Sequence, residues 1–156
     1  MLDAPRIVHT EPLHYAAIHR TCALSEISTV MDAGIKEVLA VLAAQGRTPT
    51  GPFFTHHFCK PMEKFDLEIC FPVDSPIQPT GDVHPAVWNA MDVARTVFHG
   101  NYTGLPGAWG ELQKWMKAEN YHGRGEFWER YLVNPNSEPN PEAWRTELSW
   151  PLAAEV

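Results

Sequence analysis

Apolar positions in the first half of the chain predict a strand, a helix and then two strands. Small and branched apolar residues at positions 15–19 predict the first strand. After Ser25, a plausible helix cap, apolar residues recur at three- and four-residue steps until Gly46, which predicts a helix with one apolar face. The runs GPFFTHHF and EKFDLEICFPV predict two more strands, with a hairpin connection at Lys60-Pro61-Met62.

The second half of the chain repeats this order of elements. After the loop SPIQPTGDVHPA, the run VWNAMDVARTVFHGNY predicts one strand or a bent pair. A helix follows, opening at Thr103 or Pro106 and ending near Asn120. EFWERYLVN and WRTELSWPL predict two final strands, joined by the loop PNSEPNPEA.

Residue similarities between the halves support an internal repeat. His19 and His99 each precede a helix, and the strands FDLEICFP and ERYLVNP both end in proline. We therefore predict an α+β fold made of two tandem β-α-β-β repeats, at about residues 5–75 and 86–152 of a single domain spanning 1–156. The repeats are expected to meet along a pseudo-twofold axis with a ligand cleft between them.

Composition excludes several classes of protein. With 156 residues, 44% of them hydrophobic and 20% charged, the chain has ordinary globular composition. Twelve Lys and Arg against 19 Asp and Glu give a net charge of −7, which repels nucleic acid phosphates and anionic membranes. The amino end, MLDAPRIVHTEPLH, has no signal-peptide pattern, and no later run is long enough to cross a bilayer. We expect a cytoplasmic protein that binds neither nucleic acid nor membrane directly.

Cysteine and histidine spacing argues against a metal or cofactor site. The three cysteines lack any C-x-x-C pair, and the eight histidines include no pair at the i, i+4 spacing of a zinc protease. Gly-rich phosphate loops, G-x-S-x-G elbows and Cys-His nucleophile signatures are also missing from the sequence. The sequence therefore predicts no metal and no cofactor.

The stretch FWERYLVNP places one acid among aromatic residues. On a strand, alternate residues share a face, so Phe127, Glu129 and Tyr131 point the same way. An ionised carboxylate among rings would attract an organic cation, with roughly 0.5–2 kcal/mol from each ring. The alternative is that Glu129 is exposed, or paired with Arg130 or Arg145, which is worth about 0–1 kcal/mol.

Four further residues are candidates for the ligand site. Glu68 shares a strand face with Asp66 and is a second candidate acid, while the alternative of a solvated edge acid applies mainly to Asp66. Trp109 lies on the apolar stripe of the second helix, where a core position is the alternative to a ligand contact. Six indoles exceed what this core needs, so some of the tryptophans on or beside strands are expected to face a pocket, and Trp88 is the site candidate among Trp88, Trp128, Trp144 and Trp150. His99 is expected to finish a strand by bonding backbone, with ligand contact as the alternative.

Four stretches, taken together, resemble the GyrI-like small-molecule-binding domains, also called AraC-type or BmrR-type effector-binding domains. They are GPFFTHHF, FDLEICFPV, VFHGNYTGLPGAWGELQKWM and FWERYLVNPNSEPNPEAWRTELSWPL. The resemblance implies two β-α-β-β repeats with a ligand cleft between them. It also implies that Glu129 meets the positive charge of a ligand. Tyr102 matches the tyrosine of the family's H-G-P-Y segment, where this chain has Asn101 in place of proline.

Three functions follow from the resemblance. The first is a stand-alone module that senses or sequesters aromatic, often cationic compounds, like the sensory part of a transcription regulator for multiple drugs. The second is a hydrolase of reactive cyclopropane-bearing electrophiles, in which Glu129 is general base or acid and Tyr102 or Tyr131 donates a hydrogen bond. The third is a protein-partner role such as topoisomerase protection. A second copy of this chain, forming a homodimer, is the other candidate partner.

Overall fold

The chain forms two compact units, and each has four described strands and one main helix. The computed structural model describes residues 1–59 and 63–153, so the hairpin connection expected at Lys60-Pro61-Met62 lies outside the described residues. One unit is Glu11–Ala90 and contains helix α1 (Ile27–Ala44); we call it the α1 unit. The other, the α2 unit, combines Met1–Thr10 with Met91–Val156 and contains helix α2 (Leu105–Ala118). The α+β class predicted from the sequence is confirmed.

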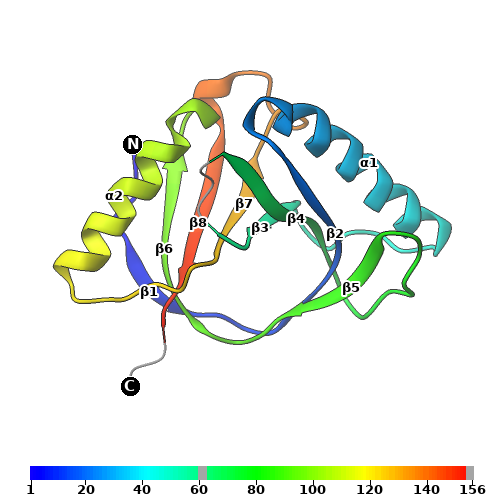
Figure 1. Cartoon of the computed structure of the whole chain (residues 1–156), viewed down its shortest axis with the longest axis horizontal. Helices are drawn as coiled ribbons and strands as arrows, with labels where there is room; N and C mark the ends of the chain where they lie inside the picture. Colours follow the sequence, from blue (N-terminus) through cyan, green and yellow to red (C-terminus); the bar gives the residue numbers. More distant parts are fainter. Residues whose placement is uncertain (60–62, 154–156) are drawn as a thin grey trace. The chain divides into compact units, whose positions relative to one another are not determined.

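In the α1 unit, one antiparallel sheet carries α1 on one face. Its described strands are β2 (Leu13–Ala23), β3 (Phe54–His57), β4 (Lys64–Val73) and β5 (Val83–Trp88), in the order β3-β4-β2-β5. A short 3-10 helix, η1 (Leu24–Glu26), leads into α1. The helix packs against β2 and β4, the two central strands of this unit (Figure 1).

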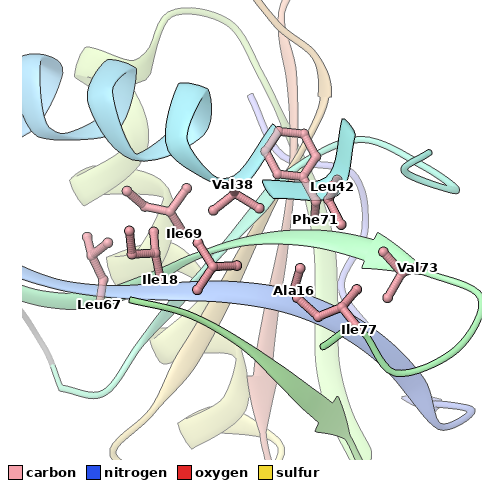
Figure 2. Packing of buried hydrophobic residues seen from close by; sticks show 10 residues of the cluster. Ala16, Ile18, Val38, Leu42, Leu67, Ile69, Phe71, Val73 and Ile77 are labelled. Carbon is pink, nitrogen blue, oxygen red and sulfur yellow. The ribbon is translucent and has the colours of Figure 1, made fainter. Parts of the chain in front are cut away.

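The core of the α1 unit lies between α1 and its sheet. Val38 and Leu42 of the helix pack onto Ile18 and Ile69 of the central strands (Figure 2). Gly34 allows this close approach, because an ideal Cβ there would lie 2.3 Å from Ile69 Cδ1. Since neighbouring residues on a strand point to opposite faces, β4 leaves its alternate residues on the face away from the helix.

The α2 unit is built in the same way. Its described strands are β1 (Arg6–His9), β6 (Asp92–His99), β7 (Phe127–Val133) and β8 (Arg145–Pro151), in the order β1-β6-β8-β7. The 3-10 helices η2 (Tyr102–Gly104) and η3 (Pro141–Ala143) precede α2 and β8. Helix α2 packs against β6 (Figure 1), and its core comprises Ala94, Phe98, Leu105, Ala108, Leu112, Met116 and Leu148.

The two strand orders match when the first is read from β5 and the second from β1. They run β5-β2-β4-β3 and β1-β6-β8-β7, and in each unit the helix connects the second strand to the last. The predicted repeat in element order is therefore present. Strand β4 corresponds to β8, so FDLEICFP matches RTELSWP in place of the predicted match with ERYLVNP. Glu68 then corresponds to Glu147, and not to Glu129.

Two strand boundaries differ from the sequence predictions. The first predicted strand is preceded by a separate strand, β1, and Pro12 lies between β1 and β2. The run VWNAMDVARTVFHGNY falls in two strands, and β5 begins at Val83, inside the predicted loop. Pro85 does not prevent this strand, because β5 is at the edge of its sheet, where proline is tolerated.

The helix starts also differ from the expected caps. Ser25 lies within η1 and does not cap α1, while the Glu26 carboxylate accepts a hydrogen bond from the Ala23 N–H at 3.0 Å. Asn101 caps η2 by accepting from the Thr103 N–H, so it supplies the turn chemistry where the family usually has proline. Among the described residues, no helix is both long and apolar enough to cross a membrane.

The packing of α1 predicts a difference between two leucines of the same helix. Leu42 is 1% exposed, whereas Leu39 of the same helix is 39% exposed. We expect Leu42→Ala to lower the free energy of unfolding by about 2–5 kcal/mol, since it leaves a cavity. Urea denaturation followed by circular dichroism measures this change. Leu39→Ala is the matched control, and an equal loss in both variants would contradict the packing described.

Candidate functional site

Glu129 is a buried carboxylate held by two aromatic donors. Its side chain is 7% exposed. Trp109 Nε1 donates to Glu129 Oε2 at 2.7 Å, and the Tyr131 hydroxyl donates to Glu129 Oε1 at 2.8 Å. The register explains the contact with α2, because Glu129 lies opposite Leu148, a member of the core beneath that helix. Strand alternation and helix packing thus bring both donors to one carboxylate.

The two donor residues of this carboxylate contact further aromatic rings. The ring centroids of Trp109 and Phe127 are 4.5 Å apart, and those of Tyr102 and Tyr131 are 5.6 Å apart. Trp144 adds a further ring, 4.7 Å from that of Tyr102. We call these residues the Glu129 cluster: Tyr102, Trp109, Phe127, Glu129, Tyr131 and Trp144. Trp144 was not among the predicted site residues. Its position at the end of the Pro-rich loop was the feature of the sequence that could have identified it.

Tyr102 contributes a further polar group to the Glu129 cluster. Its hydroxyl oxygen is buried and has no hydrogen-bond partner among the described residues. Burial and the nearby negative charge of Glu129 raise the pKa of Tyr102 to about 12. The phenol is therefore neutral at physiological pH and keeps a proton to donate.

The interpretation of Glu129 as an exposed or arginine-paired acid is wrong. Arg130 instead donates to Glu147 Oε2 at 3.0 Å. Arg145 donates to the backbone carbonyls of Glu142 and Trp144. Strand alternation accounts for the first result, because Arg130 points to the opposite face of β7 from Glu129. Trp109, for which a core position was the alternative, is half-buried and bonds the carboxylate.

Glu68 is a second buried acid, in the α1 unit. Its oxygens lie 3.1 Å from His56 Nδ1 and 2.9 Å from His84 Nε2, and the Tyr15 hydroxyl donates to it at 3.4 Å. Burial alone would raise the pKa of Glu68, but the hydrogen bonds and charges of His56 and His84 hold it below its ordinary value. Glu68 is therefore a buried, hydrogen-bonded acid and not a solvated one. No group of three or more His, Cys, Asp or Glu in the described part of the chain is arranged to hold a metal ion.

Trp88 and His99 complete the predicted site residues. Trp88 is buried in the α1 unit with its ring centroid 6.2 Å from that of Phe54. His99 is the last residue of β6, and its backbone N–H donates to the Met1 carbonyl at 2.9 Å. Its Nε2 is 2.8 Å from Asp3 Oδ1, an ion-pair distance without hydrogen-bond geometry. The ring of His99 thus faces Asp3 and does not join the Glu129 cluster.

The fold is that of a small-molecule-binding domain. Residues 3–153 match the GyrI-like small molecule binding domain, and the chain belongs to this family. A comparison with curated protein sequences found no match.

Solved structures share this fold at low sequence identity. The EcmrR C-terminal domain has a TM-score of 0.86 and 20% identity, and the match covers 97% of this chain and 98% of that domain. In the EcmrR–DNA complex the TM-score is 0.88 at 18% identity, and the match covers 97% of this chain but only 58% of the EcmrR chain. A hydrolase encoded by lin2189 from Listeria innocua has a TM-score of 0.71 at 11% identity, and the match covers 96% of this chain and 91% of the hydrolase chain. SAV2435 bound to tetraphenylphosphonium has a TM-score of 0.69 at 13% identity, and the match covers 97% of this chain and 95% of the SAV2435 chain.

The lowered pKa of Glu68 predicts a pH-dependent contribution to stability. Because its folded-state pKa lies below the ordinary value of 4.5, ionised Glu68 stabilises the fold above pH 4.5, and this contribution is lost as pH falls through the folded-state pKa. We expect Glu68→Gln to be less stable than wild type near neutral pH, with the difference shrinking in acid.

Chemical denaturation across this pH range measures the difference. Glu63→Gln is the control, because Glu63 is exposed just before β4. A difference between wild type and Glu68→Gln that stays constant down to strong acid would contradict the ion pairing assigned to Glu68.

Proposed function

We propose that this domain binds small aromatic cations and that Glu129 supplies the negative charge that recognises them. The observation that carries the proposal is a buried carboxylate fixed by Trp109 and Tyr131 within a cluster of rings. Both of these donors are neutral groups, and together they orient the carboxylate.

The surrounding rings favour a hydrophobic cation that carries aromatic groups. Ring faces attract a cation by roughly 0.5–2 kcal/mol each, and the attraction is strongest where water is excluded. Tyr102, Trp109 and Trp144 are partly exposed, so their rings offer a route from the surface towards buried Glu129. A compact inorganic or strongly hydrated cation would gain less from such surroundings, because it would lose its hydration shell.

Tyr102 is expected to set the second polar contact with a ligand. Its buried hydroxyl has no hydrogen-bond partner in the described part of the chain. Because the pKa of Tyr102 is raised to about 12, the hydroxyl keeps its proton at physiological pH. A ligand oxygen or nitrogen acceptor placed there would satisfy a donor that is otherwise costly to bury. We therefore expect ligands that combine a delocalised cation with one hydrogen-bond acceptor to bind best.

Two of the structural relatives fit this proposal. SAV2435, with the same fold, is bound to tetraphenylphosphonium, an aromatic cation. EcmrR carries a similar domain within a longer chain that forms a complex with DNA. A role for this chain in signalling or sequestering drug-like compounds is part of the proposal, and a protein partner or a homodimer stays a prediction.

The charge of Glu129 predicts a selective loss of affinity for cations. Glu129→Gln keeps the shape of the side chain, and its amide can still accept from Trp109 and donate to the Tyr131 oxygen. We expect tetraphenylphosphonium to bind about tenfold more weakly or worse, which is about 1.4 kcal/mol. Isothermal titration calorimetry measures this change.

Two controls sharpen this experiment. Neutral triphenylphosphine oxide should lose little affinity, because it has no charge for the carboxylate to attract. Glu119→Gln removes the same charge from an exposed position outside the Glu129 cluster and should leave both ligands unaffected. An equal loss for the cationic and the neutral compound would show that Glu129 acts through shape alone, against the proposal.

A hydrolase is the second candidate, and the Tyr131–Glu129 hydrogen bond favours it. In this mechanism Glu129 would act as general base on water, or as general acid, while Tyr131 or Tyr102 donates to the developing oxyanion. The hydrolase from Listeria innocua shares the fold.

Turnover separates the two candidates. If the chain is a hydrolase, wild type should open a strained cyclopropane electrophile through many cycles, and Glu129→Gln should abolish product formation. Mass spectrometry of the products with excess substrate measures this. Stoichiometric binding with no ring-opened product would eliminate the enzymatic function and leave the binding function intact.

A further inference from the structure

A hollow lies at the carboxyl end of α2, apart from the Glu129 cluster. Its lining comes from the last turns of the helix, the loop after it and strand β8, and shares no residue with the cluster. Trp150 stands between the two regions, with its ring 5.6 Å from Trp109 and 6.2 Å from Phe127. The lining residues are Gln113, Met116, Lys117, Asn120, Tyr121, His122, Gly123 and Trp150.

The aromatic walls of the hollow are held in place. Trp150 Nε1 donates to the Arg124 carbonyl at 2.6 Å, which fixes the indole. The Tyr121 ring stacks on Trp115, with centroids 5.7 Å apart and planes 23° apart. Gly123 lets bare backbone lie against the indole, because an ideal Cβ there would be 2.2 Å from Trp150 Nε1. Fixed rings reduce the entropy lost when a planar molecule binds.

The polar groups of the hollow favour an anion. Lys117 brings a positive charge and His122 an imidazole, while the described lining residues include no acid. Gln113 and Asn120 add side-chain amides that can donate hydrogen bonds. Met116, which is 3% exposed, gives the hollow an apolar wall. The lining therefore combines flat rings, an apolar surface and a cation at the rim.

The end of α2 does not oppose an anion as strongly as a bare helix end would. The carboxyl end of a helix carries partial negative charge on its unpaired carbonyls. Here the carbonyls of Trp115, Met116 and Lys117 accept backbone N–H groups from Glu119, Tyr121 and Asn120. Asn120 makes this possible by adopting a left-handed φ of 62°.

We propose that this hollow is a second ligand site, which takes small planar aromatic carboxylates. The ring would lie between Trp150 and Tyr121, and the carboxylate would pair with Lys117. This ligand class has the opposite charge to that proposed for the Glu129 cluster, so the two sites would discriminate between aromatic compounds by charge.

Titration with 2-naphthoate, followed by NMR of the nitrogen-15-labelled full chain, tests the proposal. We expect saturable shifts of the Tyr121 and Gly123 amides and of the Trp150 indole N–H. Lys117→Glu should weaken binding about tenfold or more, because it replaces attraction by repulsion. Lys114→Glu is the matched control, since Lys114 is exposed on the same helix outside the lining, and it should change affinity by less than about twofold.

Ligand controls distinguish this site from the Glu129 cluster. Neutral naphthalene-2-carboxamide should bind more weakly than 2-naphthoate. Glu129→Gln should bind 2-naphthoate like wild type, and excess tetraphenylphosphonium should not displace this carboxylate. The proposal is overturned by the absence of saturable shifts at these three residues. It is also overturned if Lys117→Glu binds 2-naphthoate like wild type, or if the carboxamide binds equally well.

Discussion

Burying a carboxylate is the constraint on which the arrangement of polar groups in both units depends. An ionised acid that leaves water must regain hydrogen bonds or opposite charge, or it destabilises the fold. Glu68 meets this need with two histidines and a tyrosine, and Glu147 contacts Arg95 at 3.4 Å and Arg130 at 3.0 Å. Glu129 is oriented by a tryptophan and a tyrosine. The same chemical group is therefore stabilised in chemically different ways within one chain.

The internal repeat places two of these buried acids at corresponding positions. Glu68 and Glu147 occupy corresponding strands, and each lies directly opposite a basic residue on the neighbouring strand, His56 or Arg130. Each glutamate is also four residues before the proline of its strand, in LEICFP and TELSWP. That shared spacing was the signal in the sequence that could have identified the correct match. The run ERYLVNP gave a false match because it also ends in a proline.

The sequence predicted local features well and long-range contacts poorly. Strand alternation was sufficient to place Glu129, Tyr131 and Phe127 on one face, and periodicity located both main helices. The bond from Trp109 to Glu129 depends on how a helix packs on its sheet, which a linear pattern does not specify. The histidine partners of Glu68 come from two other strands, and only the pairing register brings them together.

Pro85 has a consequence for the behaviour of the protein in concentrated solution. It lies in β5, the outermost strand of the α1 unit, opposite Ala16. An open strand edge normally offers a row of backbone donors to which another chain can add. A proline nitrogen carries no hydrogen, so a foreign strand aligned along this border would lack one anchor. Fibre growth from this side is thereby discouraged by a covalent feature that no change of pH or salt can remove.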